Sequence, residues 1–310
     1  MSNSLGTANT GKIISQKVPY ALLAAFPALA QFANNYAPDQ LLWGQSVVVK
    51  KRGLYTASDF DPATGYAGAT QPLGMTDILV TLNKWAVMNV QLNDEEQTST
   101  DIDFIGVNAQ QIAYALGLHL FGNLFAQVNV GGTQSAPTGF VNETVIANAA
   151  YTRSSASVAM KALNDRNVVP FNRIVILNNT AAESLQQDFQ IVGNYDPTNK
   201  LVTEADLPRV AGADHSRYSA LPAGTQSLFG IAAHADALAI ATRLPKTPKT
   251  DLNINGIIET IDGPIPIQLR RWYDMDLGVE NYTNTFMYGV SQGVTEALQR
   301  LVTAANTLPA

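Results

Sequence analysis

Near the start of the chain, β-branched runs and alternation of apolar with polar residues predict two strands. The run QSVVVKKRG (45–53) is rich in valine, and TDILVTLNKWAVMNVQLN (76–93) alternates between an apolar and a polar face. The stretch between these runs is rich in Pro and Gly and lacks the period of a helix. Together the segments predict a long hairpin over 43–84. Its loop is longer than compact packing requires, which is typical of loops that bind something.

Helical periods lie on both sides of this hairpin. Residues 1–18 are small and polar and predict an extended arm, whereas Tyr20–Asn34 predicts a short helix. Apolar residues then recur at helical spacing from 105 to 128. A second helix is predicted over Thr144–Asn167 and ends before Pro170. Its apolar stripe consists of small residues, which lets other elements approach closely.

Strands predominate in the second half of the chain. Arg173–Asn178 predicts a buried strand, and Thr180–Glu183 carries a capping-box signature for the start of a short helix. Residues 229–245 predict a strand that continues into an Ala-rich helix. The segment 253–288 alternates as strands, and a helix near Thr295–Ala305 is predicted to close the chain. Because strands and helices are mixed without a regular strand–helix–strand repeat, the predicted fold class is α+β.

The chain is poor in charge. Charged residues make up 14% of it, well below the roughly 25% typical of soluble proteins. This composition favours an obligate assembly, whose interfaces are depleted in charge. Basic residues predominate in 1–52 and acidic residues in 53–140, so the arm suits an acidic surface of its own chain or of a neighbour. Nucleic-acid binding is not indicated, because it needs clustered Lys and Arg.

The stretch GTANTGK (6–12) has the skeleton of a phosphate-binding P-loop. A P-loop needs a buried strand before it and a Ser or Thr after the Lys, but Lys12 is followed by Ile13 and only a few polar residues precede Gly6. We therefore expect an arm that binds no nucleotide. The apolar stretch Tyr20–Ala33 is too short to span a bilayer, and no secretory signal is visible, so we expect a soluble protein of intracellular origin.

Candidate catalytic residues are few. The chain has no cysteine, and its three histidines do not have metal-ligand spacing. His119 lies on a periodic apolar helix, which favours a core or interface role. Asp236, two residues after His234, is expected to cap a helix. The acidic run 94–96 predicts a solvated turn. We therefore expect no active site and no bound cofactor or metal.

The order of these elements resembles a tailed-bacteriophage major capsid protein of the Hong-Kong-97-type fold. DILVTLNKWAVMNVQLNDEEQTSTDIDF (77–104) resembles the return strand of that family's extended loop and the acidic step into the next helix. ALNDRNVVPFNRIVILNNTAAESL (162–185) is similar to the passage from the spine helix into the axial domain. FGIAAHADALAIATRLP (229–245) and RRWYDMDLGVENYTNTFMYGV (270–290) resemble later segments of the family. The resemblance covers roughly residues 43–295.

The resemblance implies a particular domain order, in which the helix 144–167 is the spine of the peripheral domain. The implied units are an N-terminal arm (1–42), an extended hairpin loop (43–84), a peripheral domain with a long spine helix (85–170 with part of 250–290), an axial domain (171–249), and closing strands with a C-terminal helix (250–310).

The resemblance also implies a structural protein, not an enzyme, that assembles as pentamers and hexamers into the icosahedral head shell of a virion. Implied partners are a scaffolding protein, a portal and a decoration protein. The shell would enclose double-stranded DNA without sequence-specific binding, and the subunits would be made in the cytoplasm of the host bacterium. The charge pattern and the small-residue stripe suggest the inter-subunit contacts: Lys50, Lys51, Arg52, Asp59, Asp61, Ala156 and Ala159.

Two other functions remain open at this point. An encapsulin compartment has the same fold, and a cargo-peptide pocket or a neighbouring enzyme gene would favour it. An enzyme with an unrecognised site is the alternative of a different class; it would form a small oligomer and turn over a substrate.

Overall fold

A computed structural model describes most of the chain. The described residues are 18–52, 57, 59–66, 75–95, 104–128, 140–192, 207, 209–219, 221, 228–246, 256–261 and 265–304. The predicted arm and its P-loop-like stretch (6–12) lie outside these residues.

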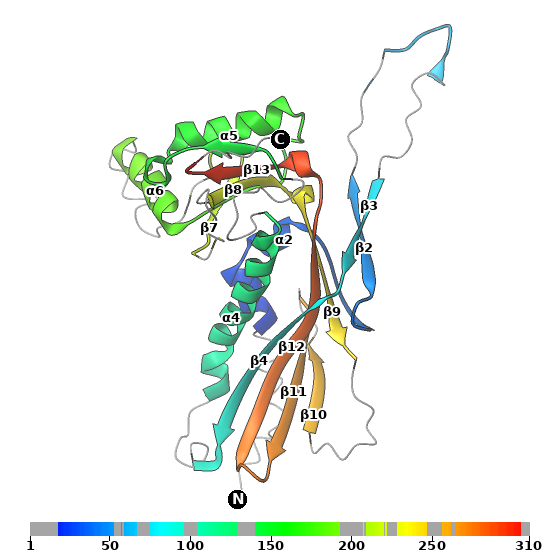
Figure 1. Ribbon diagram of the computed structural model, residues 1–310, viewed down its shortest axis with the longest axis vertical. Coiled ribbons are helices and arrows are strands. Elements are labelled where there is room, and N and C mark those ends of the chain that lie inside the picture. The colour runs from blue at the N-terminus through cyan, green and yellow to red at the C-terminus, as the bar shows by residue number, and fades with distance from the viewer. Residues whose placement is uncertain are drawn as a thin grey trace, which may run out of the picture.

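In the described residues, the strands form a six-stranded, a five-stranded and a two-stranded sheet (Figure 1). The six-stranded sheet has a path of five strands, and a further strand, β4, pairs with β12. Strand β1 runs parallel to β9, and the other pairs are antiparallel. The path is β1 (Ala33–Leu41), β9 (Leu238–Pro245), β12 (Val279–Gln292), β11 (Ile267–Asp274) and β10 (Gly256–Ile261), with β4 (Lys84–Asn93) beside β12.

Helix α4 (Phe104–Ala126) lies along the six-stranded sheet and contacts β4 and β12. This confirms the helix predicted from the apolar period. Its buried positions recur at that spacing, as Ile112, Leu116, Leu120 and Leu124 show. Among the described helices, none is both long and apolar enough to cross a bilayer.

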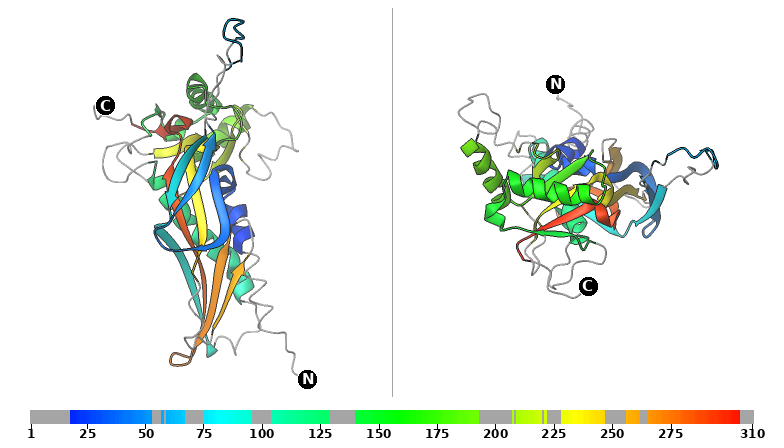
Figure 2. Two further views of the ribbon diagram at one scale, coloured as in Figure 1. Left: turned by 90° about the vertical axis from the view of Figure 1, so that its right-hand side faces the viewer. Right: turned by 90° about the horizontal axis from the view of Figure 1, so that it is seen from above.

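The five-stranded sheet carries two helices on its outer side. The strands, in order, are β5 (Glu143–Val145), β13 (Leu298–Val302), β8 (Leu228–His234), β6 (Arg173–Leu177) and β7 (Asp214–Arg217). Helix α5 (Arg153–Asp165) contacts β13, and α6 (Asn179–Val192) contacts β6 and β7. Figure 2 shows both helices over this sheet, with the hairpin extending away beside them.

The hairpin itself is confirmed. Strand β2 (Ser46–Arg52) pairs antiparallel with β3 (Met75–Thr81), with Val48 opposite Leu79. The strand predicted over 173–178 is also confirmed, as β6, and every residue of that strand is buried. The strands expected between 253 and 288 are β10, β11 and β12.

The helix predicted over Tyr20–Asn34 is only partly correct. Residues 18–25 are helical, but the helix stops near Pro27, whose ring and missing N–H do not fit a helix interior. A separate short helix, α2 (Ala28–Gln31), follows, and β1 then pairs with β9 from Ala33 onward.

The helix predicted over Thr144–Asn167 is wrong in its first third. Residues 143–145 form β5, which pairs with β13, and α5 begins only at Arg153. The side chain of Thr152 accepts a hydrogen bond from the Ser155 N–H and so caps the helix there. Because α5 lies on the five-stranded sheet, it is not the long helix of the other layer; that helix is α4.

The Ala-rich helix predicted within 229–245 is also wrong. Residues 235–237 form one 3₁₀ turn, η3, and 238–245 form β9. All eight residues of β9 are buried, and the strand pairs with β1 and β12 on its two edges. Alanine favours helices, but its preference amounts to tenths of a kcal/mol per residue, so pairing and burial in the sheet prevail.

The predicted C-terminal helix near Thr295–Ala305 is wrong for the same reason. Only residues 295–297 are helical, as the 3₁₀ turn η4, and Leu298–Val302 form the buried strand β13. The predicted start of α6 is shifted as well. Asn178, not Thr180, is the capping residue, because its Oδ1 accepts the Ala181 N–H at 2.9 Å.

The predicted domain limits do not coincide with the sheets. The unit expected over 85–170 contributes β4 and α4 to one layer, and β5 and α5 to the other. The unit expected over 171–249 likewise contains β8 of the five-stranded sheet and β9 of the six-stranded sheet. The chain passes directly between the two sheets at η3 and again at 293–297, so each layer is built from segments far apart in the sequence.

Replacing Ala159 with Leu should destabilise the subunit by about 1–3 kcal/mol, because Ala159 is fully buried and extra methyl groups would overpack its site. The matched control is Val158→Leu, since Val158 lies next to it on the exposed side of α5 and should change stability by less than about 0.5 kcal/mol. Urea unfolding measures both. Equal free energies of unfolding for the two variants would contradict the packing described for α5.

Candidate assembly site at the hairpin

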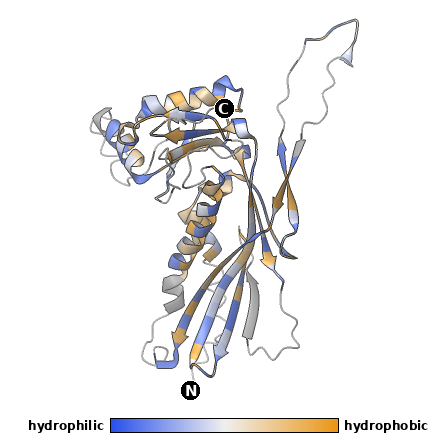
Figure 3. Ribbon diagram, in the orientation of Figure 1, coloured by the Kyte–Doolittle hydropathy of each residue, from blue (hydrophilic) through white to orange (hydrophobic). Residues whose placement is uncertain are grey.

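The root of the hairpin sits on small residues of the six-stranded sheet. The inner side chains of Val47, Val49 and Val80 are buried and form a separate apolar cluster with Ala239 and Ala241 of β9. Figure 3 shows that the described part of the hairpin strands contains both hydrophobic and hydrophilic residues. Alanines let the hairpin backbone approach the sheet closely. The contact is apolar and therefore has little directional preference of its own.

Two glycines at the end of β12 allow an even closer approach. A Cβ at Gly289 would overlap the Thr81 backbone and the Val80 side chain, which belong to β3. Four residues further on, a Cβ at Gly293 would overlap the Lys51 ammonium and the Asp236 carbonyl oxygen. Each strand of the hairpin therefore meets this part of the chain at a position where only glycine fits.

Lys51 is buried, contrary to its expected place in an inter-subunit contact. It is 1% exposed and lies in phase with Val47 and Val49 on the inner face of β2. Its Nζ donates a hydrogen bond to the Asp236 backbone oxygen. Burial lowers the pKa of Lys51 to about 8, and the negative charge of Asp236 opposes that shift. The side chain is therefore mainly an ammonium at neutral pH.

Asp236 lies at the point where the chain passes between the two sheets. Its carbonyl oxygen accepts the Val294 N–H at 3.0 Å as well as the Lys51 ammonium. Nearby, the Gly293 N–H donates to the Ala237 oxygen at 2.8 Å. Both passages between the sheets are thus bonded to each other, and Lys51 joins the hairpin to them.

The outer face of the hairpin is open. Lys50 is exposed on this face and lies opposite Asp77, while the neighbouring Val48 and Leu79 are 42% and 63% exposed. Arg52 is the last residue of β2, and the structure does not describe its side chain. The predicted basic cluster is therefore divided, because Lys50 and Lys51 lie on opposite faces of one strand.

The described residues at the tip of the hairpin carry an exposed aromatic pair. The Phe60 and Tyr66 rings lie 5.2 Å apart, yet the residues remain 60% and 86% exposed. Asp61 organises the turn between them, since its Oδ1 accepts the Ala63 N–H at 2.9 Å. Asp59 is exposed as well. These residues lie beyond the ends of β2 and β3, away from both larger sheets (Figure 1).

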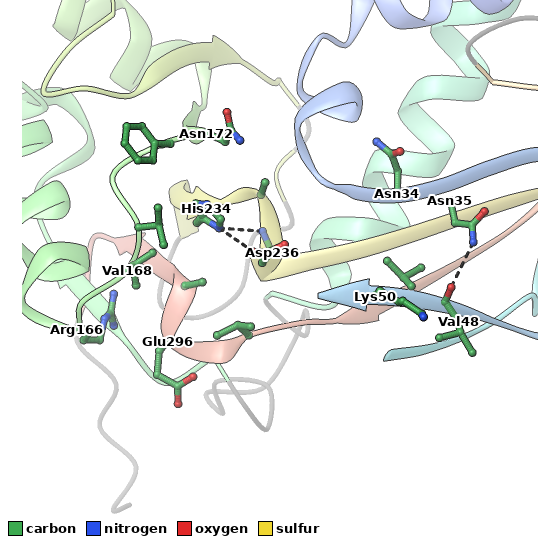
Figure 4. A pocket seen from close by; sticks show the side chains of 16 residues that line it. Asn34, Asn35, Val48, Lys50, Arg166, Val168, Asn172, His234, Asp236 and Glu296 are labelled. Atoms are coloured by element: carbon green, nitrogen blue, oxygen red, sulfur yellow. Dashed lines mark hydrogen bonds and ion pairs between the residues drawn. The ribbon is translucent and has the colours of Figure 1, made fainter. Parts of the chain in front are cut away.

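A hollow of about 800 Å³ separates the hairpin root from the five-stranded sheet (Figure 4). Asn35 and Val48 line one wall, joined by a hydrogen bond of 3.3 Å from Asn35 Nδ2 to the Val48 oxygen. Arg166 and the exposed Phe171 line the opposite wall, which belongs to the segment after α5. The width of this hollow therefore depends on the direction in which the hairpin leaves the sheet.

His234 and Asp236, also beside this hollow, have a structural role that differs from the prediction. His234 caps the turn η3, because its Nδ1 accepts the Asp236 N–H at 3.2 Å (Figure 4). The Asp236 carboxylate lies 3.5 Å from the same nitrogen. The prediction assigned the capping role to Asp236. In the described residues no group of three or more His, Asp or Glu is arranged to hold a metal ion.

The other two histidines and the acidic turn are separate from the hairpin. His119 is exposed, with its ring 6.0 Å from that of Tyr288, so it is not a core residue of the subunit. His215 is buried, and burial lowers its pKa to about 4. Asp94 is exposed at the end of β4 and accepts a hydrogen bond of 2.6 Å from the Tyr273 hydroxyl.

Ala156 and Ala159 are not available for contacts between subunits. Both are fully buried in the main core of the subunit. The small-residue stripe thus serves packing of α5 on its own sheet. Alternation along β2 places Lys51 with Val47 and Val49, and this period was the signal that could have predicted its burial. The roles of Gly293 and of the Asp236 carbonyl had no comparable signal.

Solved capsid structures share this fold. The capsid protein of the cyanophage P-SCSP1u matches with a TM-score of 0.52 and 16% identity, over 89% of this chain and 87% of that chain. The mature capsid of bacteriophage PhiM1 matches with a TM-score of 0.50 and 10% identity, over 89% and 86% of the two chains. The chain therefore has the expected Hong-Kong-97-type capsid fold. No protein family matches the sequence, and no curated protein matches it.

Raising the pH from 8 to 10.5 should stabilise the wild-type subunit relative to Lys51→Met. Because the pKa of Lys51 is lower in the folded chain than its ordinary 10.5, the unfolded chain binds more protons in this range. The free energy of unfolding should therefore rise with pH, by up to about 3 kcal/mol more than in the variant. Urea unfolding of both proteins at several pH values measures the difference. Parallel pH profiles would contradict the burial of a charged Lys51.

Proposed function

We propose that this chain is the major capsid protein of a tailed bacteriophage and forms the icosahedral head shell around the phage genome. The observation that carries the proposal is the fold, which matches phage capsid proteins over nearly the whole length of both chains. A fold alone can serve several functions. The surface features of the hairpin add support that is specific to this sequence.

The hairpin fits a subunit whose contacts are made mainly with copies of itself. Its tip has an aromatic pair, Phe60 and Tyr66, that remains 60% and 86% exposed in the subunit. Burying a Phe or Tyr side chain contributes about 1.5–3 kcal/mol. In a closed shell this modest contact is repeated in every subunit, so its total contribution is large. A single misplaced subunit is held weakly and can still dissociate.

Lys50, Asp59 and Asp61 are the predicted contact residues that the structure leaves exposed. We assign them to contacts between neighbouring subunits, with the aromatic tip between them. Such exposed charges are worth at most about 1 kcal/mol each and weaken in salt, so they select the orientation of the contact more than its strength.

The remaining parts of the proposal follow from a capsid role. Subunits would assemble as pentamers and hexamers, with a separate scaffolding protein, a portal and a decoration protein as partners. The shell would enclose double-stranded DNA without reading its sequence, because the chain is acidic overall. The protein would act in the virion as a structural component rather than as an enzyme, after synthesis in the cytoplasm of the host bacterium.

The direct test is expression of the chain with and without a scaffolding protein, followed by sedimentation and electron microscopy. Closed shells of pentamers and hexamers would support the proposal. Shells that co-purify with a specific enzyme inside them would instead identify an encapsulin-type compartment. A small stable oligomer under every condition would contradict both.

Replacing residues 56–74 with a short Gly-Ser turn should leave a folded subunit but abolish shells, because we assign the tip of the hairpin to contacts between subunits. A narrower variant, Phe60→Ser with Tyr66→Ser, should lower shell yield about ten-fold through loss of the aromatic anchor. Thermal unfolding by circular dichroism should remain near wild type in both. Ala63→Ser, in the same turn, is the control. Wild-type shell yield without 56–74 would refute the role given to the tip.

A further inference from the structure

We infer that Lys51 is a positioning residue: its ammonium, seated between Gly293 and the Asp236 carbonyl, fixes the direction in which the hairpin leaves the subunit. The inference concerns the free subunit. Its consequence for assembly rests on the proposed function.

The position of Lys51 makes it suited to this role. It lies near the end of β2 that is closer to the hairpin tip, whereas Val47 lies near the other end of the strand. Its side chain crosses from the hairpin to the link between the two larger sheets. The acceptor, the Asp236 carbonyl, is held by its own hydrogen bond from Val294. A side chain that leaves the hairpin at this point and binds a fixed acceptor restricts rotation of the hairpin about its root.

The rest of the root supplies a weaker restriction, since its other directional contact described above, from Asn35 to the Val48 oxygen, is long at 3.3 Å and exposed to solvent. The valines of the hairpin contact Ala239 and Ala241 through methyl groups, and such contacts tolerate small rotations because they have no required angle. A charged donor does require a particular angle to its acceptor. A buried ammonium that moves away from its acceptor loses the hydrogen bond that offsets the cost of its desolvation. Lys51 thus adds a defined direction to the apolar contact between the hairpin valines and β9.

The cost of burying Lys51 also argues for a role other than stability. Its lowered pKa means that burial disfavours the ammonium. Apolar side chains of similar volume commonly replace buried charges without loss of stability. Val49 and Val47, two and four residues before it on the same face, are apolar. A third apolar residue would complete this apolar contact, whereas Lys51 adds a directional hydrogen bond and a charge beside Asp236.

The space that holds the Lys51 ammonium lies between Gly293 and the Asp236 carbonyl oxygen. Gly293 removes the side chain that would otherwise fill the space, and the 3₁₀ turn η3 presents the Asp236 carbonyl to it. A change at Gly293 should therefore displace Lys51 without altering Lys51 itself. Because the added Cβ would also overlap the Asp236 carbonyl oxygen, Gly293→Ala perturbs this contact from the acceptor side, while Lys51→Met removes its donor.

The test measures a distance in the unassembled subunit. The chain has no cysteine, so Asp77→Cys on exposed β3 and Gln111→Cys on the exposed side of α4 accept a pair of spin labels. Pulsed electron resonance then gives the distance distribution between hairpin and body. We expect a narrow distribution in the otherwise unchanged chain and a shifted or broadened one in Lys51→Met and in Gly293→Ala. Lys161→Met, which removes an exposed charge on α5, is the control and should match the unchanged chain.

A purely structural role for Lys51 would lower the unfolding temperature without changing this distance. An unchanged distribution in both Lys51→Met and Gly293→Ala, each folded by circular dichroism, overturns the inference. If Lys51→Met does not fold, Lys51→Gln replaces it in the chain that carries the two spin labels. An unchanged distance distribution in that variant and in Gly293→Ala then overturns the inference.

Assembly is measured separately, by sedimentation of unlabelled proteins. We expect shell yield to fall about ten-fold or more in Lys51→Met and to stay near wild type in Lys161→Met. If the wild-type chain forms no shells, the proposed function fails, while the distance measurement still decides the role of Lys51. If shells form at full yield although the distance has changed, the hairpin direction does not govern assembly.

Discussion

The two passages of the chain between its larger sheets are hydrogen-bonded to each other, and the rest of the architecture depends on that link. One passage follows β8 and the other follows β12, and their backbones pair through Gly293 with Ala237 and through Val294 with Asp236. Each sheet contributes one strand to each passage. The angle between the layers, the hollow beside them and the seat of the hairpin all take their position from these few backbone bonds.

The hairpin illustrates how polar and apolar contacts divide their roles at such a junction. Its valines and the alanines beneath them supply the contact area, while glycines set how closely the strands approach. A single buried ammonium adds direction. At the far end the same hairpin exposes an aromatic pair that its own subunit does not cover. One element is therefore buried at its root against its own chain and exposed at its tip.

Much of this architecture could be predicted from local patterns, and the errors have physical causes. The hairpin and α4 have periodic apolar positions and β6 has a run of β-branched residues, so all three have clear local signals. Strands β9 and β13 do not, because they are buried on both faces and rich in residues that also favour helices. Their state is decided by strands distant in sequence, which local propensity does not describe.

The candidate site was predictable in place but not in detail. The charge pattern and the length of its loop pointed to the hairpin. Lys50 and Asp61 of the hairpin are exposed on the surface of the subunit. The separation of Lys50 from Lys51 follows from the alternation of any strand. The acceptor of Lys51 is a backbone carbonyl, which every residue possesses, so no residue type could have marked it.

The order in which strands occur along the chain has a consequence for synthesis. Strand β12 lies inside the six-stranded sheet and β13 inside the five-stranded sheet, yet both belong to the last part of the sequence. Neither sheet can close until that part has left the ribosome. The hairpin, by contrast, is translated well before Gly289 and Gly293, the residues that its two strands approach most closely. A chain cut short before Gly289 would therefore lack both the residues on which the hairpin root packs and the inner strand β13 of the five-stranded sheet.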